Sequence, residues 1–287
     1  MAAAGAAATI RWWSNDTVAV VTGSNKGIGF EIVRGLAKQG ITTVLTARDQ
    51  TRGRKAQSKL TAVGLSVAFH QLDVSNKDSI ESFTSWLEKE YGGLDILINN
   101  AGILVPEVSN EIAKAVLETN FFGPKRLTQK LLPLLRPSPF GSRIVNVSSR
   151  LGQLYEFKNE AVIKHLKDNV EELDEPTLDS IAQQYLEDVK SGAWRSRGWE
   201  TQCPQYAESK LFLNGYTRLV ARSLLNRPDG HKVYVNAICP GYIRTDLTKN
   251  TPVAQPVVVG ADTPVWLALS QNGATGKFFG ERREIDF

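Results

Sequence analysis

Residues 18–29 read Val18-Ala19-Val20-Val21-Thr22-Gly23-Ser24-Asn25-Lys26-Gly27-Ile28-Gly29, a short apolar run followed at once by a glycine-rich turn. The apolar run predicts a buried strand, and the residues after the turn, to about Lys38, predict a helix. Glycine suits positions 23, 27 and 29 because the backbone turns sharply there and must approach a pyrophosphate without a Cβ in the way. The N-terminus of the helix presents unpaired N–H groups and a positive dipole end to that anion. This arrangement predicts a dinucleotide-binding domain.

Further runs rich in β-branched residues follow at 41–48, 67–74, 94–99, 143–149, 233–239 and 277–279. Helical patterns separate most of them. Strands that alternate with helices predict a parallel sheet with right-handed crossovers. We therefore expect an α/β fold, a Rossmann-type doubly wound parallel sheet of about seven strands. Residues 1–16 are expected to form a flexible tail, and residues 17–287 a single domain.

The composition is that of an ordinary globular protein, with 42% hydrophobic and 22% charged residues and a net charge of +4. The basic residues are scattered, so neither nucleic acid nor a membrane is an expected partner. No apolar run approaches the length needed to span a bilayer. Two cysteines, Cys203 and Cys239, support no disulfide framework and fit a cytoplasmic location. The three histidines are isolated from them and from each other, so no metal site is expected.

Residues 151–205 interrupt the alternation of strands and helices. Two sets of apolar residues recur here at helical spacing: Val162, Ile163, Leu166, Val170 and Leu173, then Leu178, Ile181, Tyr185 and Val189. Pro176 precedes the second set and suits the first turn of a helix. We expect two amphipathic helices inserted into the domain. The end of the segment, Trp194 to Trp199, either walls a substrate pocket with aromatic rings or anchors the inserted helices.

Tyr206 and Lys210 are four residues apart and therefore share one face of a helix. An unperturbed tyrosine titrates near ~10 and is a poor acid catalyst at neutral pH. A nearby positive charge favours the phenolate and lowers the pKa toward the range where general acid catalysis is efficient. The pair predicts a proton donor, Tyr206, beside a bound nicotinamide.

The residue that closes the second strand distinguishes NAD from NADP. An acidic side chain there would bind the ribose 2′-hydroxyl, but this chain has Arg48. Arg48, with Lys26 on the glycine turn and Arg52 as a further contributor, predicts charge-assisted contacts to a 2′-phosphate, whereas Asp49 argues mildly against it. We expect NADPH as the cofactor.

Short polar side chains also follow the third and fourth strands. Asp73 is placed to hold the adenine, and Asn100 to line the cofactor cleft, because ligands of open α/β sheets bind at the carboxyl ends of the strands. Asn99-Asn100 is also compatible with a plain turn that has asparagine in a left-handed conformation.

With these motifs the chain resembles the short-chain dehydrogenase/reductase family. The resemblance runs from Val18 to the C-terminus and rests on Thr-Gly-x3-Gly-x-Gly at 22–29, Asn-Asn-Ala-Gly at 99–102, Ser148-Ser149, Tyr-x3-Lys at 206–210 and Pro240-Gly241, in that order. Residues 25–29, 45–49 and 119–123 are similar to the monomeric NADPH carbonyl reductase branch. Arg11-Trp12-Trp13-Ser14 is more similar to its plant members, the menthone/neomenthol and salutaridine reductases.

The resemblance implies four catalytic residues: Asn120, Ser149, Tyr206 and Lys210. Ser149 and Tyr206 would hydrogen-bond the carbonyl oxygen as it becomes negative, and Tyr206 would give up its proton. Lys210 would lower the pKa of the phenol and hold the nicotinamide ribose, and Asn120 would anchor a water. Ser148 is the alternative to Ser149. The full set of expected cofactor-binding residues is Gly23, Asn25, Lys26, Gly27, Ile28, Gly29, Arg48, Arg52, Asp73, Val74, Asn100, Tyr206, Lys210, Pro240, Gly241, Ile243 and Thr245.

The loop after the sixth strand is expected to meet the nicotinamide, with the Ile243 backbone at the carboxamide. Cys239 precedes it and either borders the pocket or is a packed, inert residue. The inserted segment 151–205 separates Ser149 from Tyr206 and enters just before the helix that the common tetrameric members use for subunit pairing. Helices laid over that face would bury its apolar stripe, so a monomer is expected.

The expected activity is NADPH-dependent reduction of a ketone or aldehyde to an alcohol, with Tyr206 as general acid and a small-molecule substrate such as a terpenoid or alkaloid ketone of plant-like secondary metabolism. One alternative is an NADPH-dependent C=C reductase of an enone. The other is a non-catalytic NADPH-binding sensor protein. The Tyr206–Lys210 pair favours carbonyl reduction and leaves the first alternative open.

Overall fold

A computed structural model describes residues 11–168, 172–199 and 201–287. The first ten residues of the expected tail and Val170 of the expected insertion helix lie outside the described residues. The strands are β1 (Val18–Val21), β2 (Thr42–Ala47), β3 (Ala68–Gln71), β4 (Ile96–Asn99), β5 (Ser142–Val147), β6 (Val233–Cys239), β7 (Phe278–Gly280) and β8 (Arg283–Ile285). The α-helices are α1 (Gly27–Lys38), α2 (Gln50–Thr61), α3 (Lys77–Tyr91), α4 (Asn110–Leu117), α5 (Gly123–Leu131), α6 (Glu160–Ile163), α7 (Glu175–Ser191), α8 (Tyr206–Ser223) and α9 (Val257–Leu269).

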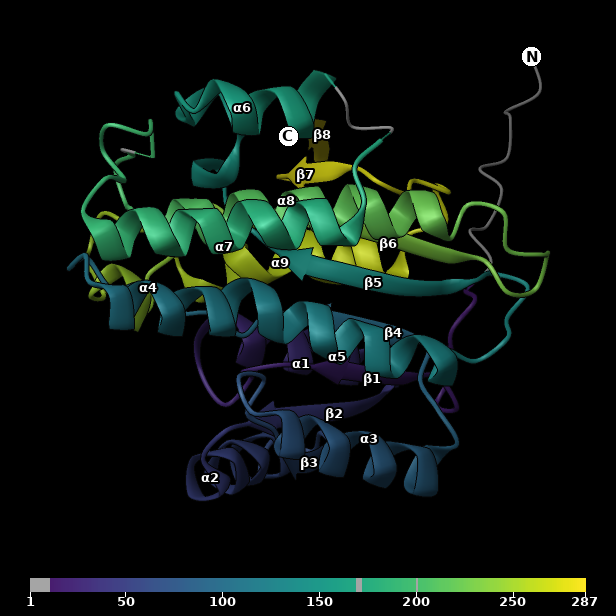
Figure 1. Ribbon diagram of the computed structural model, residues 1–287. Helices are drawn as coiled ribbons and strands as arrows, with labels where there is room; N and C mark the ends of the chain where they lie inside the picture. The colour runs from purple at the N-terminus through teal and green to yellow at the C-terminus, as the bar shows by residue number, and fades with distance from the viewer. Residues whose placement is uncertain (1–10, 169–171, 200) are drawn as a thin grey trace, which may run out of the picture.

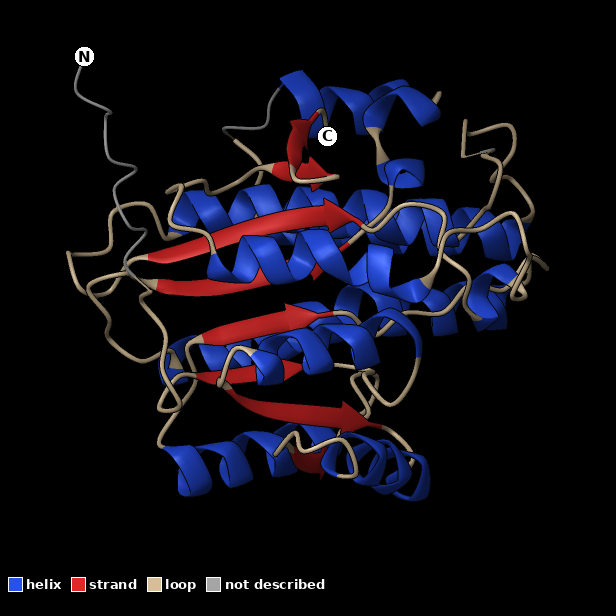
Figure 2. Cartoon of the chain, turned by 180° about the vertical axis from the view of Figure 1, so that it is seen from behind, coloured by secondary structure: helices blue, strands red, loops and turns tan. Residues whose placement is uncertain are grey.

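The strands form one sheet in the order β3-β2-β1-β4-β5-β6-β7-β8. The first seven are parallel, and their carboxyl ends meet at one edge, at the left in Figure 1 and at the right in Figure 2. The order reverses direction between β1 and β4, which is where a doubly wound sheet opens a crevice for a ligand. The predicted fold class is confirmed.

The sheet has an eighth strand that the sequence did not predict. β8 pairs antiparallel with β7 across a two-residue turn in which Glu281 and Arg282 both have positive φ, 52° and 61°. Two such residues make the tight hairpin turn that usually carries asparagine or glycine. Because neither is present, the turn had no recognisable sequence signal.

Two apolar cores cover the two faces of the sheet. On one face, strand residues such as Val18 and Val20 pack with α3, α4, α5 and α8. On the other face, Ala19 and Val21 pack with α1, α2 and α9. Alternate residues of β1 thus point into different cores, so this strand is apolar throughout its length.

The inserted segment lies outside the first helical layer. α6 is a single turn that continues into a π turn at Lys164–Asp168, so the first inserted helix is shorter than expected. α7 begins after Asp174, whose side chain accepts a hydrogen bond from the Thr177 N–H (2.8 Å), and packs on α4 and α8 (Figure 1). α8 presents Gly215 to the insertion, where a Cβ would lie only 3.2 Å from Leu166 and 3.4 Å from Leu178. The close approach explains a glycine in mid-helix.

Within the described part of the chain, none of the helices combines the length and the apolarity needed to cross a bilayer.

Candidate active site

The glycine turn is fixed to the end of β4 by hydrogen bonds. The Asn100 side-chain amide donates to the carbonyls of Thr22 (2.9 Å) and Gly23 (3.2 Å), and Thr22 Oγ1 accepts from the backbone N–H groups of Asn100 (2.9 Å) and Ala101 (3.0 Å). A Cβ at Gly29 would lie 2.4 Å from that amide and 2.8 Å from the Ser24 Cα. Asn100 therefore holds the turn in shape, and glycine is required for the turn to close.

The first turn of α1 is open to an anion. Its N-cap residue, Lys26, makes no side-chain cap, and the first turn contains no acidic residue. The N–H groups at this end therefore have no side-chain acceptor and can bind a phosphate. The loop after β6 reaches the same place, since a Cβ at Gly27 would lie 3.5 Å from Thr245.

The residues expected at the adenosine end lie around the ends of β2 and β3. Arg48 is exposed, and the Asp49 carboxylate accepts a hydrogen bond from the Arg52 backbone N–H (2.8 Å), which makes it the N-cap of α2. Asp49 is thus engaged by the helix that follows it. Asp73 accepts from the backbone N–H (2.9 Å) and hydroxyl (2.6 Å) of Ser75.

Lys26 lies differently from the expectation. It forms an ion pair with Asp246, which follows Thr245 in the loop after β6, and both side chains are more than 60% exposed. The partner was missed because the two residues are far apart in the sequence. Exposed ion pairs contribute at most about 1 kcal/mol, so the lysine remains available to a stronger anionic ligand.

Further along the carboxyl edge of the sheet, α8 brings Tyr206 and Lys210 to the end of β5. Tyr206 is the first residue of the helix, and Lys210 Nζ lies 5.5 Å from the centre of its ring. The ammonium donates to the Val147 carbonyl (2.9 Å). Tyr206 keeps part of its surface accessible, whereas Lys210 is buried. The phenol can therefore meet a substrate while the amine stays behind it.

The adjacent serines have different surroundings. Ser149 is partly accessible and faces Tyr206, where its side chain acts to lower the pKa of the phenol. Ser148 is buried, and its hydroxyl donates a hydrogen bond to the Lys210 carbonyl (3.4 Å). The geometry favours Ser149 over Ser148 as the residue that faces a substrate.

Asn120 lies in a π turn, Glu118–Phe122, between α4 and α5. Its side chain is fully engaged, since Oδ1 accepts from the Ile103 N–H (2.8 Å) and Nδ2 donates to the Ile103 carbonyl (2.9 Å) and Ser209 Oγ (3.0 Å). The side chain of Asn120 therefore joins the loop after β4 to α8, and both its oxygen and its nitrogen are already engaged.

Burial dominates the electrostatics of the pair. It raises the pKa of Tyr206 above its ordinary value, a nearby Cys239 adds to the rise, and Ser149 opposes it. It lowers the pKa of Lys210 to about 8. The expected lowering of the Tyr206 pKa is thus wrong for this structure, because desolvation of the phenolate dominates and raises the pKa.

The remaining expectations concern the tryptophans and Cys239. Trp199 is buried against Tyr185 (5.1 Å between ring centres) and donates to Asp188 (2.9 Å), so it anchors the insertion and does not wall a pocket. Trp194 is likewise buried, and its backbone N–H donates a hydrogen bond to the Asp188 carbonyl (3.1 Å). Cys239 is buried beside Tyr206 and Lys210.

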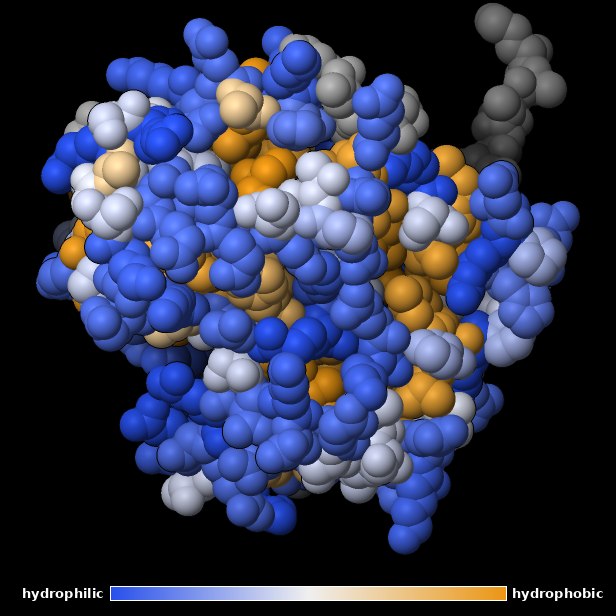
Figure 3. Space-filling view, viewed as in Figure 1, coloured by the Kyte–Doolittle hydropathy of each residue, from blue (hydrophilic) through white to orange (hydrophobic). Residues whose placement is uncertain are grey.

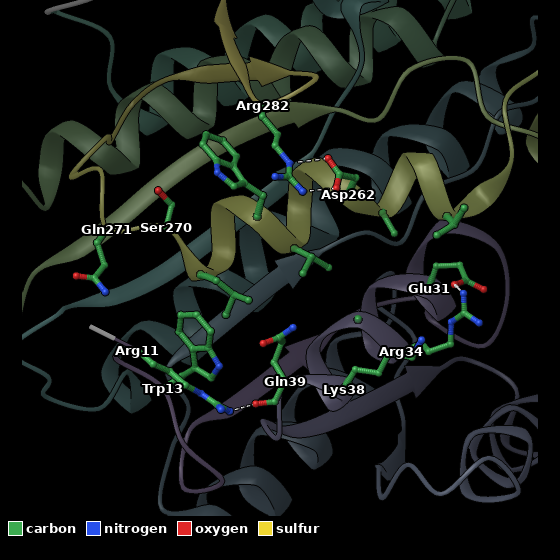
Figure 4. Close-up of a pocket in the computed structure, with 16 residues that line it drawn as sticks. Arg11, Trp13, Glu31, Arg34, Lys38, Gln39, Asp262, Ser270, Gln271 and Arg282 are labelled. Atoms are coloured by element: carbon green, nitrogen blue, oxygen red, sulfur yellow. Dashed lines mark hydrogen bonds and ion pairs between the residues drawn. The ribbon is translucent and has the colours of Figure 1, made fainter. Parts of the chain in front are cut away.

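A cavity among the described residues lies away from this site. It measures about 650 Å³ and lies between α1, α9 and the segment before β1 (Figure 4). Four basic residues line it, two of them already paired, Arg34 with Glu31 and Arg282 with Asp262. None of the residues expected to act in catalysis or to bind the cofactor lines it.

Comparison with known proteins supplies the family context. The family model for short chain dehydrogenases matches residues 17–162. Carbonyl reductase [NADPH] 1 of Bos taurus is 39% identical over 282 residues, covering 96% of this chain and 99% of that protein. (+)-Neomenthol dehydrogenase of Arabidopsis thaliana is 38% identical over 298 residues, covering 94% and 97%.

Two solved plant enzymes have similar structures. Salutaridine reductase from Papaver somniferum matches with a TM-score of 0.83 at 33% identity, covering 92% of this chain and 99% of that one. Menthone neomenthol reductase from Mentha piperita matches with a TM-score of 0.78 at 33% identity, covering 92% and 98%.

Proposed function

Because this chain belongs to the short-chain dehydrogenase/reductase family, we propose that it is an NADPH-dependent reductase that converts a ketone or aldehyde to an alcohol. The observation that carries the proposal is the convergence of Tyr206, Ser149 and Lys210 at the carboxyl edge of the sheet, beside the open N-terminus of α1. The carbonyl reductases and the neomenthol dehydrogenase among its relatives support it.

The residues of the cleft fit a dinucleotide. Added Cβ atoms at Gly23 and Gly29 would meet protein atoms within 3 Å, so the turn is as close-packed as a pyrophosphate cradle requires. The uncapped start of α1 would hold the pyrophosphate. Arg48 and Lys26 would bind a 2′-phosphate. NADPH supplies a hydride when it is bound.

The protein's part is to stabilise and protonate the substrate oxygen. Ser149 and Tyr206 donate hydrogen bonds to that oxygen as negative charge develops on it. Because burial raises the pKa of Tyr206, the phenol keeps its proton until a strongly basic alkoxide forms. Lys210, with a pKa of about 8, is largely protonated at neutral pH and stabilises the phenolate left behind. A water at Asn120 would restore the proton.

Ser149→Ala tests the reaction directly. Loss of one donor to the developing oxyanion should lower kcat for NADPH-dependent ketone reduction by about 10²-fold. Ser148→Ala is the matched control, and its kcat should stay within a few-fold of the unmodified protein. Steady-state assays over a panel of bulky ketones and aldehydes measure both. Equal losses in the two variants would contradict the assignment, and binding of NADPH without turnover on any carbonyl would contradict the activity.

We propose NADPH rather than NADH on the strength of Arg48 and Lys26. Asp49, the one residue that argued against it, is the N-cap of α2. Arg48→Ala should raise KM for NADPH about tenfold and leave KM for NADH unchanged, because only the former carries the 2′-phosphate. Arg54→Ala serves as the control, because it removes a nearby cation, on α2, whose guanidinium lies over the Phe69 ring (5.8 Å). Parallel changes for both cofactors would contradict the proposed contact.

We further propose a monomer of a single catalytic domain. α7 covers α8 and α4, and buried Lys125 of α5 binds Asp179 of α7 (2.6 Å), so the expected pairing face is occupied within the chain. The face seen in Figure 3 is predominantly hydrophilic. Sedimentation equilibrium at micromolar concentration should give the mass of one chain, 31.6 kDa. A stable dimer or tetramer would contradict this proposal.

For the substrate we propose a bulky carbonyl compound, a terpenoid or alkaloid ketone of plant-like secondary metabolism. Support comes from the names of the similar proteins, salutaridine reductase and menthone neomenthol reductase. A cytoplasmic location is proposed from the free cysteines Cys203 and Cys239.

A further inference from the structure

The backbone turn that precedes Tyr206 is strained and buried. Gln205 has φ 56° and ψ −39°, in the left-handed region that non-glycine residues rarely adopt, and it is fully buried. Its side-chain amide does not cap α8. Nε2 donates instead to the carbonyls of Val105 (3.0 Å) and Glu107 (2.5 Å) in the loop after β4. Since Tyr206 comes next, this turn sets the direction of the phenol.

Glu208 supports the turn from inside the helix. It is the third residue of α8, the position from which a glutamate reaches back to the N-cap N–H. The Gln205 backbone N–H faces this carboxyl and acts to lower its pKa. The Thr201 hydroxyl is a second donor to the carboxyl, with 3.4 Å between Thr201 Oγ1 and Glu208 Oε1. The carboxyl is therefore the acceptor that the third position of α8 offers to the strained turn.

The surroundings of Glu208 favour its uncharged form. The side chain is fully buried, and burial raises its pKa to about 8 despite these hydrogen bonds. The titratable groups coupled to it, in the part of the chain that the structure describes, are Tyr185 of α7 and Cys203 before α8. Neither is a cation, and the pKa of each is raised further by Glu208. A carboxylate here would be a buried charge without compensation, which is costly.

Polar side-chain atoms without hydrogen-bond partners occur in Glu208 and in two residues that interact with it. Among the described residues, Tyr185 Oη, Gln205 Oε1 and Glu208 Oε2 are buried without a hydrogen-bond partner. A protonated carboxyl adds an O–H donor to a cluster that holds unpaired acceptors. The cluster joins the inserted segment, through Tyr185 and Thr201, to the first turn of α8.

We propose that Glu208 is a positioning residue that acts as an uncharged acid, fixing the Gln205 turn and thereby aiming the Tyr206 phenol. The inference rests on the proposed function, because it assigns Glu208 a role in that reaction. It also connects the insertion to catalysis: ionisation of Glu208 loosens the cluster, displaces the turn and lowers the reaction rate.

Kinetics of two variants test the role. Glu208→Gln keeps an acceptor for the Gln205 N–H and a donor, so kcat at pH 7 should stay within about threefold of the unmodified protein. Glu208→Leu keeps the volume but removes the acceptor, so kcat should fall at least about tenfold, with KM for NADPH unchanged, because the acid is misaligned. A wild-type kcat in Glu208→Leu, or an equal loss in both variants, would overturn the proposal.

The pH profile distinguishes positioning from simple packing. Above pH 8 the unmodified protein should lose activity through two groups, Lys210 and Glu208, each with a pKa of about 8. In Glu208→Gln only Lys210 of these two groups still titrates, so the activity of this variant should fall less steeply with pH. Identical alkaline limbs in the two proteins would overturn the proposed role.

A stability measurement needs no substrate. A carboxyl whose pKa is raised on folding stabilises the protein below its ordinary pKa of 4.5, and that contribution is lost as pH rises to about 8. The urea midpoint of Glu208→Gln should therefore rise relative to the unmodified protein from pH 5 to 8 and level off above. Glu187→Gln, at an exposed position of α7, should show no such trend. If the urea midpoints of Glu208→Gln and the unmodified protein changed in parallel with pH, the proposal that Glu208 is an uncharged acid would be overturned. If the expected trend appeared but the protein turned over no carbonyl compound, only the proposed function would be overturned.

Discussion

Helix α8 is fixed to the end of β5 by main-chain as well as side-chain contacts. Lys210 Nζ donates to the Val147 carbonyl (2.9 Å), and a Cβ at Gly152 would lie 2.5 Å from the Lys210 carbonyl carbon. The segment that follows β5 and helix α8 are thus as close as glycine allows. The separation of Ser149 from Tyr206 is set by this contact, and a reaction that aligns two donors on one oxygen tolerates little displacement.

The same burial that fixes these groups also changes their acidity. It raises the pKa of Tyr206 and lowers that of Lys210, so the phenol is a weak acid that gives up its proton only to a strongly basic alkoxide. The insertion contributes to this enclosure, since Tyr185 and Trp199 pack on Phe212 of α8. Besides covering the helix, the insertion would, through its contact with Glu208, support the turn before Tyr206 in the proposed reaction.

Sequence reasoning succeeded where the determinant is local. The glycine turn and the four-residue spacing of Tyr206 and Lys210 are readable because backbone clashes and helix geometry act over a few residues. It failed where tertiary contacts decide. The Lys26–Asp246 pair joins distant segments, and the direction of the Tyr206 pKa depends on burial that spacing does not reveal. Glu208 three residues after Gln205 matches half of a capping box, a signal that could have been found.

The proposed reaction requires the Tyr206 hydroxyl to protonate the substrate oxygen. Tyr206→Phe removes that hydroxyl and keeps the ring, so turnover and cofactor binding can be measured separately. We predict that kcat for NADPH-dependent ketone reduction falls by about 10³-fold while the dissociation constant for NADPH stays within a few-fold. Full activity in this variant would contradict the account.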